Sequence, residues 1–399
     1  MAQVTERVDS VERPADRRAV ALVTLGHVFN DVNQGAVPAL LPFLVIERGL
    51  TFAEAGGLML AANILSSVTQ PLFGLLADSR SATWVMPAGI LTAGSGIALA
   101  GVAPTYPWLV AAILLSGLGV AAFHPEGSRC ANHAAGSRKS TGMSFFAVGG
   151  NVGFASGPVI ITPLLVIFGV AGAVWMIVPA GAMALVLLAN LRRLASPPSL
   201  KRTRGEPVAQ EDRQEVGAFV RLTGVVILRS VAFFSFVAFI PLYWLEVLGA
   251  TPALSNASLT ILLGAGVVGT LGGGWLADRW RARPIVIGGL IGVGALLSVL
   301  LATGAAGAPA LLLLVVMGVC LYLPFAVMIT MGHAYLWRRI GTASGVTIGL
   351  SMTIGGLVAP LLGAYADRNG LPAALWIVAV VPLVGAALAS TLPPPRHRT

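Results

Sequence analysis

Charge is scarce in this sequence. Asp, Glu, Lys and Arg together make up 10% of the 399 residues, hydrophobic residues make up 56%, and the mean hydropathy is +0.86. Soluble domains usually carry roughly 25% charged residues. This scarcity excludes an ordinary soluble domain and predicts an all-α protein that crosses a membrane many times.

Cysteine and clustered metal ligands are also lacking. Cys130 and Cys320 are the only cysteines, one near an expected helix end and one in the middle of another helix. They indicate no disulfide framework and no thiolate metal site. The five histidines show no clustered ligand spacing, which argues against a metal site. An enzyme would need such ligands or a nucleophile–base set, so we expect neither an enzyme nor a cofactor.

Apolar runs dominate what is present. A membrane span needs about 20 residues, and twelve runs are long enough. They cover residues 19–46, 53–77, 84–103, 107–128, 142–168, 172–191, 219–248, 254–277, 284–304, 309–333, 342–365 and 372–391. Residues 1–18 hold four arginines and four acids without an apolar core. That composition indicates a polar tail rather than a signal peptide.

Lysine and arginine gather on one side of the predicted membrane. When both termini are placed in the cytoplasm, only Arg48 and Arg368 fall in outer loops, and Arg229 falls inside a span. This positive-inside pattern predicts that both termini lie in the cytoplasm. The formal net charge of +9 would suit nucleic-acid binding, but the basic residues sit in short loops, which argues against it.

The two halves of the chain repeat each other. Residues 74–80 (G-L-L-A-D-S-R) recur as 274–279 (G-W-L-A-D-R), and Pro42 matches Pro241, at offsets of 200 and 199 residues. Parallel six-helix repeats are typical of one large class of secondary transporters. We therefore expect a cytoplasmic tail (1–18), a first six-helix bundle (19–191), a cytoplasmic linker (192–218), a second six-helix bundle (219–391) and a final tail (392–399).

The repeated loop resembles the conserved loop after the second helix of the major facilitator superfamily, G-x-L-a-D-r-x-g-r-r. Asp78 with Arg80, and Asp278 with Arg279, hold its acidic and basic positions. An aspartate at a helix C-terminus opposes the helix dipole and favours a nearby cation or helix N-terminus. The resemblance thus implies a gating latch on the inner face. Ser79 stands where a basic residue is usual, which predicts a weaker first copy; an ordinary polar loop is the alternative.

The span 19–46 carries polar residues at mid-depth. Asp31 lies about 18 Å along it by helical rise, His27 lies one turn earlier on the same face, and Gln34 continues that face. A carboxylate at this depth is costly unless it faces a cavity or a partner. We expect Asp31 to carry protons with His27 as its tuner, and Asn30 and Gln34 to contact substrate. The alternative is a buried structural pair.

A stretch rich in ionisable residues ends the span 107–128. His124 and Glu126 flank Pro125, which removes a backbone N–H and favours a kink. Glu126 lies about 27 Å along the helix, just inside a hydrocarbon core of about 30 Å. We predict that His124 and Glu126 face the cavity as a second titrating pair, with Arg129 as an anion contact. The alternative is a helix end that has reached the cytoplasm.

One arginine is expected inside the membrane. Arg229 lies about 15 Å into the span 219–248, opposite Asn30 and Asp31 by the repeat offset. It could bind an anionic solute or pair with Asp31. It could also extend its side chain to the inner surface, if its helix begins later than we expect.

His27, Asn30, Asp31 and the stretch 123–126 (F-H-P-E) together resemble the fosmidomycin-resistance branch of the superfamily. The resemblance covers most of the chain. It implies the major facilitator fold, twelve transmembrane helices in two six-helix bundles, with helices 1, 4, 7 and 10 around a central cavity. It also implies proton-driven drug efflux from the inner membrane.

Two further positions bear on that resemblance. Residues 153–158 (G-F-A-S-G-P) resemble the motif G-x-x-x-G-P of antiporters, although helix packing alone could explain the small residues. Ile113 stands where many drug–proton antiporters carry an arginine. A coupling scheme that needs that arginine does not transfer to this chain.

These observations predict a proton-coupled secondary transporter that exports a small organic solute or drug by alternating access. Its expected partners are the solute, protons and the lipid bilayer, without nucleic acid, and we expect a monomer. Uptake of a small organic anion by proton symport is the main alternative, because the same residues would serve it. A lipid flippase is a further alternative.

Overall fold

The computed structural model describes residues 14–79, 82–136, 139–195, 215–336, 343, 346–347 and 351–394. These residues lie almost entirely in helices, and no strand occurs among them. In the first bundle the helices are α1 (Arg17–Arg48), α2 (Phe52–Ser79), α3 (Val85–Val102), α4 (Tyr106–Ala134), α5 (Lys139–Phe168) and α6 (Ile177–Ala189). In the second they are α8 (Val216–Glu246), α9 (Pro252–Arg279), α10 (Ala282–Thr303), α11 (Gly307–Tyr335), α13 (Ser351–Asn369) and α14 (Leu371–Ala389).

Where they are described, the helices agree with the predicted spans, apart from a 3-10 turn at the start of the sixth span and a short helix after it. The sixth span begins as a 3-10 helix, η1 (Val170–Met176), before α6 continues it. Gly169 turns the chain there with φ at +63°, which favours glycine, and the Glu47 carboxylate accepts the Val170 N–H at 3.0 Å. The eleventh span was expected from residue 342, but most of 337–350 lies outside the described residues. A four-residue helix, α7 (Leu191–Leu194), opens the predicted linker.

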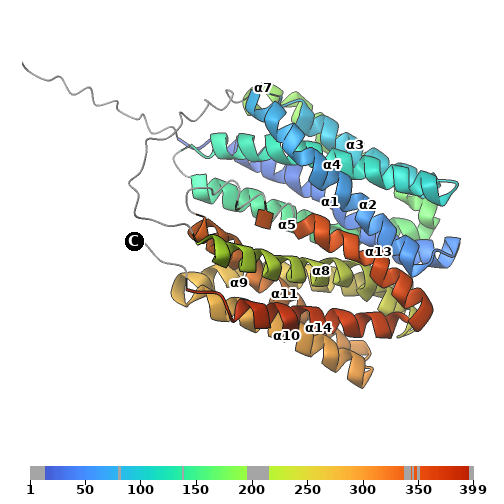
Figure 1. Cartoon of the computed structure of the whole chain (residues 1–399). Coiled ribbons are helices and arrows are strands. Elements are labelled where there is room, and N and C mark those ends of the chain that lie inside the picture. Colours follow the sequence, from blue (N-terminus) through green and yellow to red (C-terminus); the bar gives the residue numbers. More distant parts are fainter. Residues whose placement is uncertain are drawn as a thin grey trace, which may run out of the picture.

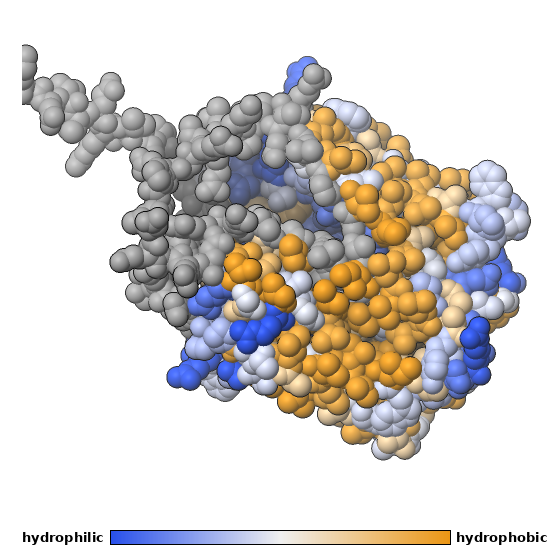
Figure 2. Space-filling model, in the orientation of Figure 1, coloured by the Kyte–Doolittle hydropathy of each residue, from blue (hydrophilic) through white to orange (hydrophobic). Residues whose placement is uncertain are grey.

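Length and composition make this a membrane protein. Among the described residues, ten helices are long and apolar enough to cross a bilayer. Figure 2 shows the matching surface, a broad apolar area across the middle of the molecule with hydrophilic residues toward its ends. Of the twelve long helices, α1 and α13 are outside those ten, and α1 carries a run of polar residues at its middle instead.

The internal repeat is visible in the turns. Gly49 ends α1 and Gly249 follows α8, both with φ at +63°. Gly169 and Gly370, with φ at +63° and +84°, precede the last helix of each bundle. Residues with a side chain are strained at such φ values, so the same backbone requirement recurs in both halves. The described chain is an all-α membrane protein built from two six-helix bundles.

Small residues let neighbouring helices approach closely inside each bundle. A Cβ on Gly153 would lie 2.3 Å from the Val28 carbonyl oxygen, and one on Gly157 would lie 2.4 Å from the Gly35 carbonyl carbon. These are the two glycines of the G-x-x-x-G-P segment. They seat α5 directly on α1, which fits the packing interpretation of the segment.

The two bundles lie side by side along α2 with α13 and along α5 with α9 (Figure 1). The start of α1 and the end of α14 lie at one end of the molecule, the terminal end, and the opposite end is the far end. At the far end the Asp367 carboxylate, in α13, accepts the N–H groups of Phe52 and Ala53 at the start of α2, at 2.7 and 3.0 Å. The two bundles are therefore joined across the far end by hydrogen bonds as well as by packing.

The apolar core shows the same asymmetry. One buried cluster runs through the far halves of both bundles, from Leu40 on α1 to Phe239 on α8. Toward the terminal end the core divides into one cluster around Phe123 and Ile90 in the first bundle and another around Leu222 in the second. Among the described residues, the buried apolar core is thus shared by both bundles at the far end and divided between them toward the terminal end.

Candidate functional site

The polar run of α1 is buried at the middle of the first bundle. His27, Asn30 and Asp31 are 6%, 0% and 7% exposed. They continue the helix without a break, and the prolines of α1 come later, at positions 38 and 42. A buried carboxylate must find partners because desolvation penalises its charge.

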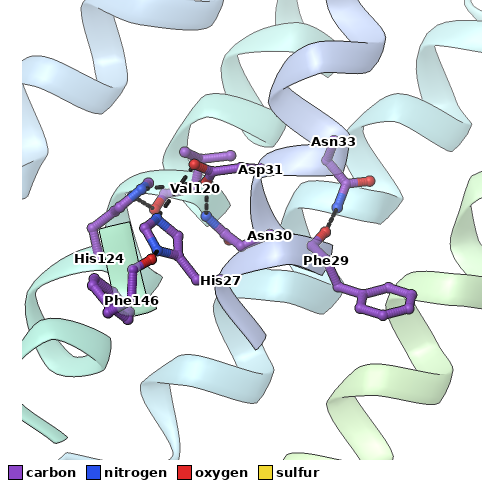
Figure 3. A network of polar contacts seen from close by, with 8 residues as sticks. All are labelled: His27, Phe29, Asn30, Asp31, Asn33, Val120, His124 and Phe146. Carbon is purple, nitrogen blue, oxygen red and sulfur yellow. Dashed lines mark hydrogen bonds and ion pairs between the residues drawn. The ribbon is translucent and has the colours of Figure 1, made fainter. Parts of the chain in front are cut away.

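Asp31 finds two histidines and an amide (Figure 3). The Nε2 atom of His27 lies 3.3 Å from one carboxylate oxygen, and the Nε2 atom of His124, from α4, lies 3.3 Å from the other. The side-chain amide of Asn30 donates to the latter oxygen at 3.0 Å. The sequence placed His124 in a pair with Glu126, but the structure brings it to Asp31, which makes a triad of His27, Asp31 and His124.

Backbone carbonyls hold both imidazoles of the triad in place. The Nδ1 atom of His27 lies 2.7 Å from the Phe146 carbonyl oxygen, and that of His124 lies 2.8 Å from the Val120 carbonyl oxygen (Figure 3). A carbonyl only accepts hydrogen bonds, so each Nδ1 carries its hydrogen. The His27 ring also stacks on Phe146, with centroids 4.0 Å apart. Each Nε2 is thereby aimed at Asp31.

Gly150 of α5 packs directly against the triad, and its position has no room for a side chain. A Cβ built there would lie 2.5 Å from Cε1 of His27 and 2.9 Å from Oδ2 of Asp31. Any side chain would push α5 away or rotate the imidazole. Gly150 therefore closes α5 over the triad.

Arg229, on α8, is the charged residue of the second bundle at this site. It is 5% exposed, its Nη1 donates to the Leu321 carbonyl oxygen at 3.3 Å, and its buried Nε has no partner. Phe325 and Phe233 lie against the guanidinium, with centroids 4.9 and 5.8 Å from Cζ. No carboxylate among the described residues forms an ion pair with it. A buried cation of this kind can bind an anion.

The triad and Arg229 line one central cavity of about 480 Å³. Both bundles contribute, through the expected helices α1, α4, α8 and α11 and also through α5 and α9. Most of its wall area is apolar, six of its lining residues are Phe or Tyr, and polar side chains come from both bundles. The lining residues are His27, Asp31, Gln34, His124, Phe146, Ala147, Gly150, Asn151, Phe154, Arg229, Ser230, Phe233, Phe234, Thr270, Tyr322, Phe325, Ala326 and Ile329. Such a lining suits a small organic solute with a charged or polar group.

Glu126 was predicted to face the cavity, but it points away from it. It is buried and bonded to the Arg129 guanidinium, whose Nε donates to Oε2 at 3.0 Å. Cys130, one turn along α4, lies 3.8 Å from its other oxygen and donates to the Leu194 carbonyl. Neither Glu126 nor Arg129 lines the central cavity. Positions two residues apart on a helix point about 200° apart, on nearly opposite faces, so His124 can face the cavity while Glu126 faces the neighbouring helices.

The remaining predicted residues are the substrate contacts of α1 and the latch residues. Gln34 lines the cavity, whereas Asn30 is fully buried and reaches Asp31 rather than the cavity. Of the predicted latch, Arg80 and the side chains of Asp78 and Asp278 lie outside the described residues. Arg279 is exposed, and its guanidinium lies 4.0 Å from the Trp275 ring centroid.

The sequence analysis did not identify two residues that connect the bundles at the far end. Asp367 joins α13 to α2, as described above. Asn256, on α9, donates to the Ala39 carbonyl oxygen at 2.9 Å and to the Thr162 hydroxyl at 2.8 Å. Both pair with groups of the other bundle that are remote in sequence, so no local pattern marks them.

Comparison with known proteins agrees with this architecture. The family model described as Major Facilitator Superfamily matches residues 23–360. The chain belongs to the major facilitator superfamily. It is therefore a multi-pass membrane transporter rather than an enzyme, and superfamily members carry small-molecule substrates.

Relatives in the superfamily match almost the whole chain. The uncharacterized MFS-type transporter YfnC of Bacillus subtilis (strain 168) is 31% identical over 393 residues, covering 96% of this chain and 95% of that one. The fosmidomycin resistance protein of Escherichia coli (strain K12) is 29% identical over 381 residues, covering 94% and 93%. A bacterial homolog of the human lysosomal transporter Spinster, in an inward-facing and occupied conformation, matches with a TM-score of 0.78 at 15% identity, covering 96% of this chain and 98% of that one.

Proposed function

We propose that this chain exports a small organic solute or drug in exchange for protons, by alternating access across the cell inner (plasma) membrane. The observation that carries the proposal is the placement of Asp31 between two histidines in the wall of a cavity built by both bundles. An ionisable group inside a membrane protein marks an ion or substrate pathway by default. The likeness to a fosmidomycin resistance protein supports efflux as the direction.

The exchange would work by competition for one charged site. Asp31 is the proposed proton carrier, with His27 from its own helix and His124 from α4 sharing its protons. Arg229 of α8 and the Tyr322 hydroxyl of α11 are the other titratable groups of the cavity. Either protons at Asp31 or solute bound at Arg229 and Gln34 would make the loaded cavity less charged than the empty one, so the two would compete for the same conformational change. An empty cavity with uncompensated charges is not expected to switch readily between the inward- and outward-facing states, because burying an unpaired charge is costly.

The proposed orientation follows from the basic loops. With both termini and the linker in the cytoplasm, the terminal end of the molecule faces inward. The separation of the two cores toward that end then corresponds to an inward-facing conformation. Asp78, Arg80, Asp278 and Arg279 are proposed to latch the terminal end in the opposite state. Glu126 and Arg129 are proposed to act through their ion pair inside the first bundle, which could exchange partners as the inner side opens or closes.

Uptake of an organic anion by proton symport is the second candidate, and the Arg229 guanidinium, which forms no ion pair with a described carboxylate, favours it. The two candidates predict opposite effects on accumulation. An exporter lowers the cellular content of its solute, and an uncoupler raises that content again. A symporter raises the content, and an uncoupler lowers it.

The test uses radiolabelled fosmidomycin in cells with and without the chain, before and after an uncoupler. We expect a lower content in expressing cells that the uncoupler restores. A higher content in expressing cells would favour symport, and equal contents would exclude fosmidomycin as a solute. An Arg229→Lys variant tests the anion contact, since lysine keeps the charge but loses the planar fork.

A further inference from the structure

We propose that the triad of His27, Asp31 and His124 is also a binding site for a late first-row divalent cation, with Zn²⁺ as the best fit. One ligand atom from each residue lies within 4.8 Å of the other two. Zinc bonds to histidine nitrogen and carboxylate oxygen measure about 2.0–2.2 Å. A tetrahedral ion with such bonds holds neighbouring ligand atoms roughly 3.3–3.5 Å apart. Each Nε2 is already 3.3 Å from a carboxylate oxygen of Asp31, His27 from Oδ2 and His124 from Oδ1.

The free electron pairs of the triad point inward. Because both Nδ1 atoms donate to backbone carbonyls, each neutral imidazole presents the lone pair of Nε2 to the carboxylate. Three acceptor groups then converge, and the donor that the structure shows among them is the Asn30 amide. Such an arrangement is repulsive until a cation enters it, either as protons or as a metal ion.

The surroundings of the triad match those of metal sites. Metal-binding histidines commonly donate their other ring nitrogen to a backbone carbonyl or carboxylate, which fixes the tautomer and the ring. Phe146 and Val120 supply those carbonyls here, and stacking on Phe146 further holds the His27 ring. Asn30 similarly orients the carboxylate of Asp31.

The chemistry of the ligands selects the ion. Two imidazoles and one carboxylate suit zinc, copper or nickel, whereas Ca²⁺ and Mg²⁺ prefer six or more oxygen ligands. All three residues line the central cavity. A fourth position is thus left for water, as in zinc sites that keep an open coordination position. No single stretch of sequence shows this set, because His124 comes from another helix.

This proposal stands on the geometry of the triad and does not require proton coupling. A bound metal ion would occupy the atoms assigned to the proton carrier, so Zn²⁺ is expected to inhibit transport. Inhibition is a consequence, and binding is the quantity that tests the proposal.

The experiment titrates ZnCl₂ into the purified full chain, with its affinity tag removed and after chelator treatment, by isothermal titration calorimetry. We expect one Zn²⁺ per chain and no matching heat with MgCl₂. His27→Gln and His124→Gln are each expected to weaken binding about tenfold or more. The matched controls His133→Gln and His333→Gln change histidines outside the triad and should bind as the wild type does.

A second measurement needs no variant of the triad. Cu²⁺ bound to the wild-type chain should show, by electron spin echo modulation, the distal nitrogens of two imidazoles in one site. The proposal is overturned if the wild type binds no Zn²⁺, if either triad variant binds like the controls, or if Cu²⁺ shows fewer than two imidazoles.

Discussion

Asp31 connects the two histidines of the triad with the side-chain amide of Asn30. Its two oxygens are shared among His27, His124 and Asn30. These partners come from α1 and α4, so a change in the charge of Asp31 alters the contact between two helices of one bundle. The carboxylate is therefore placed to link protonation to helix packing.

Asp31→Asn should abolish gradient-driven transport. The variant should still be expressed like the wild type and should still exchange solute for solute. Asparagine keeps the shape of the side chain but cannot release a proton. Flux into vesicles under an imposed pH gradient measures this, with Asp16→Asn as the control because Asp16 lies outside the cavity. Wild-type gradient-driven flux in Asp31→Asn would remove this residue from the coupling mechanism.

Gly150→Ala should disturb the same site without changing any charge. The new Cβ would lie 2.5 Å from the His27 ring, and overpacking of this kind typically costs about 1–3 kcal/mol. Transport should fall and the thermal midpoint should drop. Gly181→Ala on α6 is the matched control, since no atom lies within 4 Å of its added Cβ; equal effects of the two changes would contradict the packing account.

At the element scale, helix positions were predictable and helix contacts were not. Each apolar run of about 20 residues specifies a span by its length alone. The direction of Glu126 and the meeting of His124 with Asp31 depend on the rotation of α4 against α1. Asp367 and Asn256 bond to residues more than 200 positions away, where the sequence offers no periodic signal. The candidate site was therefore predicted in part, through His27, Asp31, Gln34, His124 and Arg229.

Asp367→Asn should weaken the closure of the far end. The carboxylate caps the N-terminus of α2 from the other bundle, and an exposed contact of this type is worth about 1 kcal/mol. A change of that size alters a two-state population about fivefold. Spin labels at Val166 and Ala253, in a background without Cys130 and Cys320, should report a larger share of long distances.

The matched control for this far-end change is Glu54→Gln. Glu54 lies at the same end, but its carboxylate accepts hydrogen bonds from the backbone and hydroxyl of Thr51, just before its own helix. The distance distribution should stay unchanged in Glu54→Gln. An unchanged distribution in Asp367→Asn would show that its two hydrogen bonds do not hold the bundles together.

The start of α1 supplies a pH-dependent contact outside the membrane span. A hydrogen bond from Arg193 holds the pKa of Asp16 below its ordinary range, and the helix-capping bond from Ala19 adds to this. A lowered carboxyl pKa stabilises the fold above the unfolded pKa of about 3.9, and this contribution is lost as pH falls through the lower folded pKa.

Arg193→Gln should therefore lower the thermal midpoint slightly at pH 7, in line with about 0.2–1 kcal/mol for an exposed pair. The difference from wild type should shrink as the pH falls below about 4. Arg192→Gln is the neighbouring control. A difference that persists undiminished at pH 3 would assign the effect to something other than this ion pair.

At the scale of the whole molecule, two bundles share one buried core at the far end. The core is continuous across the far halves and divided toward the terminal end, and the cavity that both bundles line holds the triad and Arg229. The repeat offset and the duplicated loop were enough to predict the two bundles. The conformation could not be predicted, because one sequence must fit both the inward- and outward-facing states.

Proton movement during solute efflux tests the central claim most directly. Proteoliposomes are loaded with fosmidomycin and a pH-sensitive dye and then diluted into solute-free buffer. Proton exchange predicts that the lumen acidifies as the solute leaves, whichever way the protein is inserted, and that Asp31→Asn shows no acidification. Efflux with an alkaline or unchanged lumen in the wild type would contradict the account.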